Sequence, residues 1–267
     1  MKYILEENRN EDVICLGDEI VYGRRKEWGS STYRQLKLSL LAARQHWSYD
    51  PHKKLPLILW ICGGGFTHMD INVWMPELVF YAKNGFAVAS IEYSTMPNTV
   101  YPAQTDDIRE AMSFLAENAD EFHLDLSRSF IMGESAGAYL AGLIALTGEK
   151  DDMGEKTCTI KGAVLLYPPV VLGKLPGNVI IDAITMGAPD LTDLVSPSAP
   201  PFFIVHGMND SLVPCEQSEK LYAALERENV ESELYLIRGC NHADSPAFQT
   251  PVKEHILHFL KEKCEEM

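Results

Sequence analysis

The sequence predicts an α/β protein in which helices cover both faces of a mostly parallel central sheet. From about Leu55 to the C-terminus, short apolar runs alternate with longer stretches of helical periodicity. The runs are almost entirely apolar, as strands buried on both faces are. A chain of 267 residues suits one domain of this class. We therefore expect a single domain over residues 1–267.

The predicted strands and helices follow one another in a regular order. The expected parallel strands are Leu57–Cys62, Ala87–Tyr93, Ser129–Met132, Ala163–Tyr167, Phe202–His206 and Glu233–Ile237. The expected helices are Trp74–Asn84, Pro102–Asn118, Ala136–Leu146, Glu216–Glu228 and Val252–Cys264. Before residue 55 the pattern differs and predicts two antiparallel edge strands. These are Asp12–Tyr22 and Gln35–Leu41, followed by a turn at Tyr49-Asp50-Pro51.

The segment 168–201 is rich in proline and glycine and is longer than a plain crossover between two strands requires. Two interpretations remain open. Long segments in compact domains are usually functional, which favours a small lid-like or substrate-facing insertion. The alternative is an irregular crossover with one short helix near Ile180–Met186.

Charge and composition restrict the class of partner. The chain has 23 basic and 38 acidic residues and a formal charge of −15, which opposes binding to nucleic acid or to an anionic membrane. No apolar run is long enough to span a membrane. The N-terminus reaches Glu6 and Glu7 before any signal-like apolar stretch, so we expect a cytoplasmic protein. A chain from which a leader had been removed would read the same way.

The cysteines predict neither disulfides nor a zinc site. Six cysteines are scattered along the chain without a Cys-x-x-Cys pair. We interpret them as reduced thiols, and we expect no metal and no organic cofactor.

The run Gly133-Glu134-Ser135-Ala136-Gly137 is the strongest indication of chemistry. Gly-x-Ser-x-Gly indicates a nucleophile when a strand leads into it and a helix leads out, because the serine must lie on a tight turn that exposes its hydroxyl. Here an apolar strand precedes the motif, and a helix rich in small residues follows it. Ser135 is therefore the predicted nucleophile. The competing interpretation is a chance pentapeptide in an ordinary strand-to-helix connection.

A serine nucleophile needs a base and an orienting acid. In this kind of sheet they follow the nucleophile in the order acid, base, on loops after later strands. Asp210 lies on the loop after Phe202–His206, and His242 lies on the loop after Glu233–Ile237. Asp210 and His242 are the predicted acid and base.

Other residues compete for these roles. Asp244 is too close to His242 in sequence to reach its ring easily, and Asp210 has an alternative interpretation as a turn residue before Pro214. His206 is expected to shape the acid loop, and His68 has a weaker claim as a substrate contact. The remaining histidines and the acidic residues of 168–201 are interpreted as structural or surface groups: His46, His52, His123, His255, His258, Asp182, Asp190 and Asp193.

The three consecutive glycines at 63–65 follow the first strong parallel strand. Glycines let a backbone turn its N–H groups toward the negative charge of an acyl tetrahedral intermediate. The N–H of Ala136, at the start of the helix after Ser135, is expected to complete this oxyanion hole. The alternative interpretation of the glycines is a flexible turn.

Taken together, the motifs resemble those of the α/β-hydrolase esterases related to hormone-sensitive lipase and to bacterial acetyl-xylan and feruloyl esterases. The resemblance covers roughly residues 33–262 and depends on these segments: Gly63-Gly64-Gly65-Phe66, Gly133-Glu134-Ser135-Ala136-Gly137, His206-Gly207-Met208-Asn209-Asp210, Val213-Pro214 and Asn241-His242. It implies an α/β-hydrolase fold, with Gly64 and Gly65 as donors in the oxyanion hole. The large cap domain of the lipase branch is not visible, so the smaller carbohydrate-esterase branch fits better.

One position departs from this family, which usually has histidine before the triple glycine where this chain has Cys62. The change leaves the loop's donors in place and puts only their supporting hydrogen bonds in doubt. A buried, unreactive thiol is the expected role of Cys62, and a reactive thiol is the alternative.

These residues predict a serine carboxylesterase that works through an acyl-enzyme on a small-molecule or carbohydrate ester. By resemblance, the acyl group is small, such as acetyl, or aromatic, such as feruloyl. The expected lining of the acyl pocket is Phe66, Met69, Trp74, Leu172 and Met186, and the alternative for each is a place in the core. The alternatives are an amidase or peptidase on the same triad, formamidase-like or prolyl-peptidase-like, and a non-catalytic binding protein. No nucleic-acid or membrane partner is expected, and a homodimer is compatible with the sequence.

Overall fold

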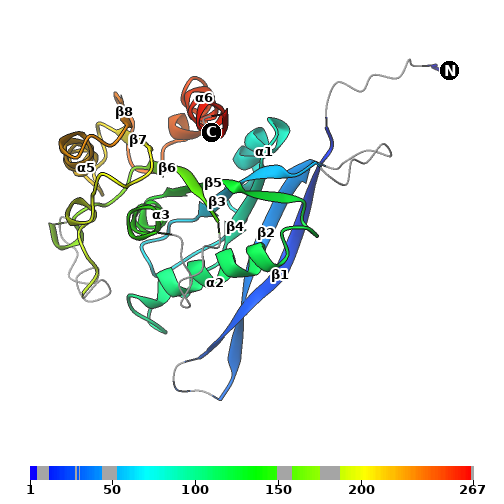
Figure 1. The fold of residues 1–267 in the computed structure, drawn as a ribbon, viewed down its shortest axis with the longest axis horizontal. Helices are drawn as coiled ribbons and strands as arrows, with labels where there is room; N and C mark the ends of the chain where they lie inside the picture. The colour runs from blue at the N-terminus through cyan, green and yellow to red at the C-terminus, as the bar shows by residue number, and fades with distance from the viewer. Residues whose placement is uncertain are drawn as a thin grey trace.

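An eight-stranded sheet organises the computed structural model, which describes residues 1–4, 12–27, 29, 31–43, 53–148, 158–174 and 187–265 (Figure 1). The strand order is β1-β2-β4-β3-β5-β6-β7-β8. The strands are β1 (Ile14–Lys26), β2 (Tyr33–Ala43), β3 (Leu55–Ile61), β4 (Ala87–Ile91), β5 (Leu124–Glu134), β6 (Ile160–Leu166), β7 (Phe202–Gly207) and β8 (Ser232–Ile237).

The pairs from β4 to β8 are all parallel, and the two pairs at the N-terminal edge of the sheet are antiparallel. All seven residues of β3 are buried. This burial on both faces explains why the sequence of β3 is continuously apolar rather than alternating. The predicted fold class, a mostly parallel α/β sheet with N-terminal antiparallel strands, is confirmed.

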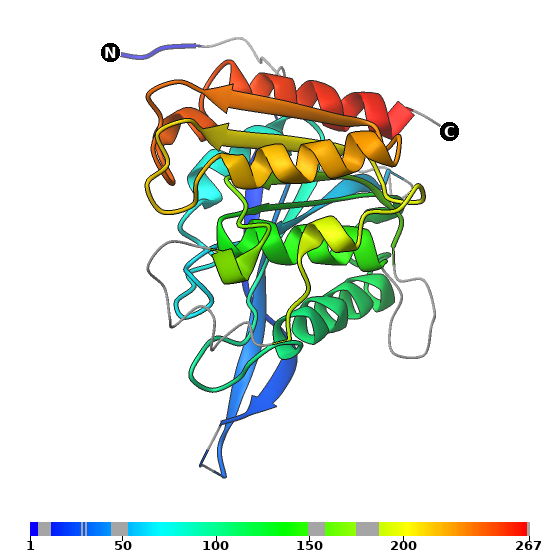
Figure 2. The ribbon, with the colours of Figure 1, turned by 90° about the vertical axis from the view of Figure 1, so that its left-hand side faces the viewer.

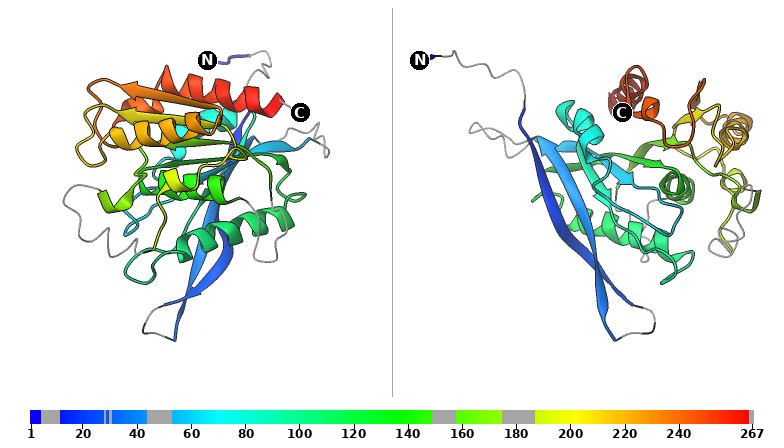
Figure 3. Two further views of the ribbon diagram at one scale, coloured as in Figure 1. Left: turned by 60° about the vertical axis from the view of Figure 1, so that its left-hand side comes forward. Right: turned by 180° about the vertical axis from the view of Figure 1, so that it is seen from behind.

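Helices lie on both faces of the sheet, as Figures 2 and 3 show. The helices are α1 (Met75–Lys83), α2 (Ala103–Glu117), α3 (Ala136–Thr147), α5 (Glu216–Arg227) and α6 (Val252–Glu265), with short 3-10 helices η1 (Leu172–Lys174), η2 (Leu191–Asp193) and η3 (Ser245–Phe248). One buried cluster joins α2, α3 and α5 to the sheet, and a second joins α1 and α6 to its other face. Among the described residues, no helix is long and apolar enough to cross a membrane.

The β1–β2 hairpin is longer than the sequence pattern predicts. Pairing continues to Lys26↔Tyr33, beyond the predicted ends of both strands, and the hairpin projects past the rest of the protein (Figure 3). Charged residues hid this extension, because an exposed ribbon has no alternating apolar face. Arg25, near the far end of β1, ties the hairpin to α2 by ion pairs with Asp107 and Glu110.

Other predictions differ from the structure or fall outside the described residues. Strand β5 begins at Leu124 rather than Ser129, because its polar start pairs with Leu55 and Pro56 before a shift in register. Within 168–201, the structure describes 168–174 and 187–201, which contain η1 and η2. The turn at 49–51 and the short helix at 180–186 lie outside the described residues. The lid-like insertion and the single-domain boundary therefore stay predictions.

Candidate active site

Ser135 lies on the sharp turn between β5 and α3. Its backbone has φ 52° and ψ −124°, a conformation that is strained for any residue with a β-carbon. The Ser135 N–H donates to the Leu166 carbonyl at 2.9 Å, which holds the turn against β6. A β-carbon at Gly137 would lie 2.1 Å from the Ile61 carbonyl oxygen. The glycine of the motif is therefore required by the close packing of the turn against β3.

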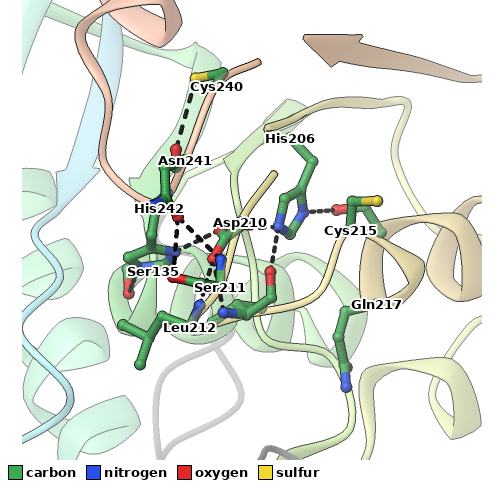
Figure 4. A network of polar contacts seen from close by, with 12 residues as sticks. Ser135, His206, Asp210, Ser211, Leu212, Cys215, Gln217, Cys240, Asn241 and His242 are labelled. Carbon is green, nitrogen blue, oxygen red and sulfur yellow. Dashed lines mark hydrogen bonds and ion pairs between the residues drawn. The ribbon is translucent and has the colours of Figure 1, made fainter. Parts of the chain in front are cut away.

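The structure brings the three predicted residues Ser135, His242 and Asp210 together from the loops that follow β5, β8 and β7 (Figure 4). His242 Nε2 is 2.9 Å from Ser135 Oγ, and His242 Nδ1 is 2.6 Å from Asp210 Oδ2. The histidine thus bridges a hydroxyl and a carboxylate. This arrangement can remove a proton from the serine and stabilise the resulting imidazolium.

Asp210 is buried and accepts several hydrogen bonds. Its Oδ1 accepts the N–H groups of Leu212 at 2.9 Å and Val213 at 2.7 Å, while Oδ2 faces His242 and, at 3.2 Å, His206 Nε2. Burial raises the pKa of Asp210, but the hydrogen bonds from His206, His242 and Val213 outweigh it and hold the pKa well below its usual range. The carboxyl group is therefore ionised. Asp210 thus contacts the predicted base and also holds the turn before Pro214 through two backbone N–H groups.

His206 supports the acid loop from inside. Its ring is fully buried, with Nε2 2.8 Å from the Val213 carbonyl and Nδ1 2.6 Å from Ser218 Oγ. Because a carbonyl only accepts, Nε2 carries the proton and points toward Val213 and Asp210. This geometry agrees with the expectation that His206 shapes the loop.

Asn241 joins the base loop to the acid loop. Its side-chain Oδ1 accepts the Ser211 N–H at 2.9 Å, and the Asn241 N–H donates to Asp244 Oδ2 at 2.6 Å. Asp244 therefore holds the backbone of the base loop, and Asp210 is the carboxylate that contacts the His242 ring.

The glycine loop starts against the turn that carries Ser135, where the Gly63 N–H donates to Glu134. Gly64 has φ 122°, and a β-carbon there would lie 1.9 Å from the His68 carbonyl oxygen. The Gly64 carbonyl accepts the His68 N–H at 3.0 Å, which closes the loop. Within the described part of the chain, the N–H groups of Gly64, Gly65 and Ala136 donate to no other residue. These three N–H groups therefore have no acceptor among the described residues, as the predicted oxyanion donors require.

Glu134 is a site residue that the sequence did not reveal. Its buried Oε1 accepts the Gly63 N–H at 2.5 Å and the Trp74 indole N–H at 3.3 Å. Burial raises the pKa of Glu134, and the hydrogen bonds from Gly63 and Trp74 only partly oppose this effect. The signal was faint because Glu134 occupies a variable position of the serine motif and its partners lie far upstream in sequence.

Cys62 has the buried, unreactive role expected of it. Its thiol contacts the Asp70 carbonyl at 3.1 Å, and burial raises its pKa to about 12. A thiol in this state stays protonated near neutral pH, which disfavours a reactive role. Among the described residues, no group of three or more His, Cys, Asp or Glu side chains is placed to hold a metal ion.

The residues expected to line the acyl pocket mostly make core contacts. Phe66 and Leu172 are 4% and 3% exposed. Met69 is partly buried and accepts the Tyr93 N–H at its sulfur. Trp74 stacks on Phe248, as described below. Met186 lies outside the described residues.

Exposed apolar side chains occur instead on the acid loop. Met208 is 46% exposed and Leu212 is 51% exposed. In Figure 4 the Leu212 side chain lies close to Ser135. These two side chains were not predicted to contact substrate, because sequence alone does not separate exposed from buried apolar residues on a loop.

Comparisons with known proteins agree with this fold. The BD-FAE family model matches residues 48–225, and the prolyl oligopeptidase family model matches residues 188–266. Esterase LipQ of Mycobacterium tuberculosis is 28% identical over 199 residues, which cover 66% of this chain and 47% of LipQ. The chain spans about half the length of the curated relatives it matches.

Two solved structures show the same fold over nearly the whole chain. A truncated carbohydrate esterase from gut microbiota has a TM-score of 0.77 at 19% identity and covers 97% of this chain and 99% of its own. An acetyl ester-xyloside bifunctional hydrolase from Caldicellulosiruptor lactoaceticus has a TM-score of 0.71 at 22% identity, with coverages of 91% and 95%. The BD-FAE match extends over well more than half of the 267 residues. The chain therefore belongs to the BD-FAE family and has the fold of α/β-hydrolase esterases.

Proposed function

We propose that this chain is a serine carboxylesterase that hydrolyses short-chain or aromatic acyl esters, with carbohydrate esters as the substrate class. The observation that carries the proposal is the position of His242, between Ser135 Oγ at 2.9 Å and the ionised Asp210 at 2.6 Å. Hydrogen-bonded serine, histidine and carboxylate side chains on a strained turn are the constellation that acyl transfer requires.

In the first step, His242 Nε2 takes the proton of Ser135 while Oγ attacks the ester carbonyl. The Asp210 carboxylate at Nδ1 keeps the other ring proton on that nitrogen, so Nε2 presents its lone pair to the serine. The negative charge on the carbonyl oxygen is stabilised by the N–H groups of Gly64, Gly65 and Ala136. One such donor is worth about 3–4 kcal/mol of transition-state stabilisation.

Collapse of the tetrahedral intermediate breaks the bond to the alcohol, which leaves with the proton held by His242. The acyl group remains on Ser135 Oγ as an ester. Water then attacks this acyl-enzyme with His242 again as base, and the acid is released.

Carbohydrate esters are favoured because two proteins of the same fold are named a carbohydrate esterase and an acetyl ester-xyloside hydrolase. The exposed Leu212 and Met208 provide apolar surface for a short acyl chain or an aromatic ring. A peptidase or amidase on the same triad is the second candidate, favoured by the prolyl oligopeptidase match over residues 188–266. A purely binding role is disfavoured, since none of the three triad side chains is missing.

The test compares wild type with Ser135→Ala on four kinds of substrate. These are p-nitrophenyl acetate, the corresponding amide p-nitroacetanilide, acetylated xylo-oligosaccharides and feruloylated sugars. Wild type is expected to cleave esters far faster than amides, and Ser135→Ala to lose several orders of magnitude in kcat. Most activity retained by Ser135→Ala would rule out this nucleophile. Faster cleavage of amides than of esters would favour the peptidase candidate.

A further inference from the structure

The Glu134 carboxyl group lies where the segments of the candidate active site meet. It precedes Ser135 in the chain and accepts hydrogen bonds from the Gly63 N–H and the Trp74 indole. Its side chain is almost fully enclosed, with 6% of the residue exposed. The carboxyl group is therefore shielded from water and has its contacts inside the protein.

The contact with Gly63 fixes the start of the glycine loop. The Gly63 N–H points to Oε1 at 2.5 Å, so it is turned away from an oxyanion. A β-carbon on Gly63 would lie 2.4 Å from the same oxygen, which means that the backbone rests directly on the carboxyl group. Three successive glycines have many accessible conformations. This contact selects the one that leaves the N–H groups of Gly64 and Gly65 free.

The contact with Trp74 connects the carboxyl group to the base loop. The Trp74 ring stacks on Phe248, with centroids 4.0 Å apart and an interplanar angle of 15°. Phe248 lies on η3, which follows His242 along the same segment. The chain of contacts from Glu134 thus extends through Trp74 and Phe248 to the loop that carries the base.

Tyr167 lies near both Glu134 and His242. Its ring packs edge-on against the His242 ring, with centroids 4.8 Å apart. Its buried hydroxyl lies close to the Glu134 carboxyl group but makes no hydrogen bond within 3.5 Å among the described residues. Burial raises the pKa of Tyr167 and the nearby Glu134 carboxylate raises it further, so the hydroxyl stays protonated beside Glu134.

We infer that Glu134 is a positioning residue that aligns the glycine loop with the loop of His242 through an acceptor oxygen. It contacts neither the reacting atoms nor the triad side chains by a hydrogen bond, so it acts through Gly63 and Trp74. The alignment depends on an acceptor oxygen at the position of Oε1 and does not depend on a negative charge there. The reaction to which this alignment applies is the one proposed above.

The experiment compares Glu134→Gln, which keeps an acceptor oxygen of the same reach, with Glu134→Ala, which removes it. Glu117→Gln is the matched control, because it removes the charge of an exposed carboxylate at the end of α2. The rate at which a fluorophosphonate probe labels Ser135 is measured with kcat and KM for p-nitrophenyl acetate. Tm identifies any variant that fails to fold.

Glu134→Ala is expected to lower both the labelling rate and kcat by about tenfold or more, as loss of oxyanion alignment does, with KM changed by less than about threefold. Glu134→Gln and Glu117→Gln are expected to stay within about threefold of wild type. A loss in Glu134→Gln as large as in Glu134→Ala would overturn the inference, because charge rather than the acceptor would then matter. A wild-type labelling rate in folded Glu134→Ala would overturn it as well.

Trp74→Phe serves if Glu134→Ala does not fold, because it keeps the stacked ring and removes only the indole N–H. A several-fold fall in kcat at constant KM supports the inference, and an unchanged kcat overturns it. Labelling does not depend on ester turnover. A wild type that is labelled but cleaves no ester would refute the proposed carboxylesterase function while leaving the Glu134 comparison measurable.

Discussion

Two buried carboxyl groups, one on each side of Ser135, meet opposite electrostatic environments. Asp210, on the acid side, faces two backbone N–H groups and two histidine rings, and its pKa is lowered. Glu134, on the side of the glycine loop, accepts two N–H groups, and burial raises its pKa. Burial alone disfavours both carboxylates, so the number and strength of the hydrogen bonds decide the difference.

This contrast separates two uses of a carboxyl group within one site. On the acid side a permanent negative charge faces His242 Nδ1. On the glycine-loop side an oxygen atom holds backbone and indole N–H groups in place, which a neutral acceptor can also do. The variants below test this division, beginning with the largest expected effect.

Asp210→Asn is expected to lower kcat for p-nitrophenyl acetate by about 10⁴-fold, because an amide can favour the wrong histidine tautomer and cannot neutralise the imidazolium. Steady-state kinetics measure the effect, and the circular-dichroism spectrum checks the fold. The corresponding change at Glu134, to glutamine, is the internal comparison. An equal fall in kcat in Asp210→Asn and Glu134→Gln would show that the two carboxyl groups are not used differently, one as a charge and the other as an acceptor.

Gly64→Ala is expected to reduce kcat by roughly 10²–10³-fold, the loss typical of one oxyanion donor. The added methyl group would lie 1.9 Å from the His68 carbonyl oxygen at a residue with φ 122°, so the loop must move. Gly173→Ala is the matched control, since nothing lies within 4 Å of its added methyl group. Steady-state kinetics of both variants on p-nitrophenyl acetate measure the effect. A wild-type kcat in Gly64→Ala would refute the assignment of the glycine loop as the oxyanion hole.

The pH dependence of stability should have opposite signs at the two carboxyl groups. The lowered pKa of Asp210 stabilises the fold above its unfolded pKa of about 3.9, and this contribution is lost as the pH falls toward the folded pKa. The raised pKa of Glu134 stabilises the fold below its unfolded pKa of about 4.3, and this contribution is lost as the pH rises through the folded pKa.

Urea unfolding between about pH 3 and 8 measures this difference. Wild type should lose stability relative to Asp210→Asn as the pH falls below about 4, and relative to Glu134→Gln as the pH rises above about 4.3. Parallel stability curves for wild type and both variants would contradict the opposite pKa shifts.

Cys62→Ser should have the smallest effect, with kcat within about threefold of wild type. A hydroxyl can replace the thiol as donor to the Asp70 carbonyl, and the Gly63 N–H remains on Glu134. Kinetics before and after treatment with iodoacetamide measure any involvement of the thiol. A loss comparable to that of Glu134→Ala would place the support of the glycine loop at Cys62 instead.

Much of the architecture was predictable because local patterns encode it. Strands buried on both faces are short apolar runs, so the position of β3 agrees with its prediction within two residues. The long β1–β2 hairpin was underestimated, because charged residues on an exposed ribbon give no alternating pattern. The order of Ser135, Asp210 and His242 was also readable, since each follows the end of a predicted strand.

The support of the site was not predictable in the same way. Glu134 acts on Gly63 and Trp74 through space, and nothing local in the sequence pairs a carboxyl group with an indole in an earlier segment. Trp74 was expected to line the acyl pocket, with a core role as the alternative. The structure gives both its ring face and its N–H to partners within the protein, Phe248 and Glu134.

The positive φ of Ser135 sets stability and chemistry against each other at one position. Glycine would adopt φ 52° and ψ −124° without a β-carbon penalty, so Ser135→Gly should unfold at a higher temperature while lacking a nucleophile. Natural selection for stability alone would favour glycine there. On the proposed assignment of Ser135 as nucleophile, the serine represents a trade-off between the stability of the turn and the hydroxyl that the turn presents.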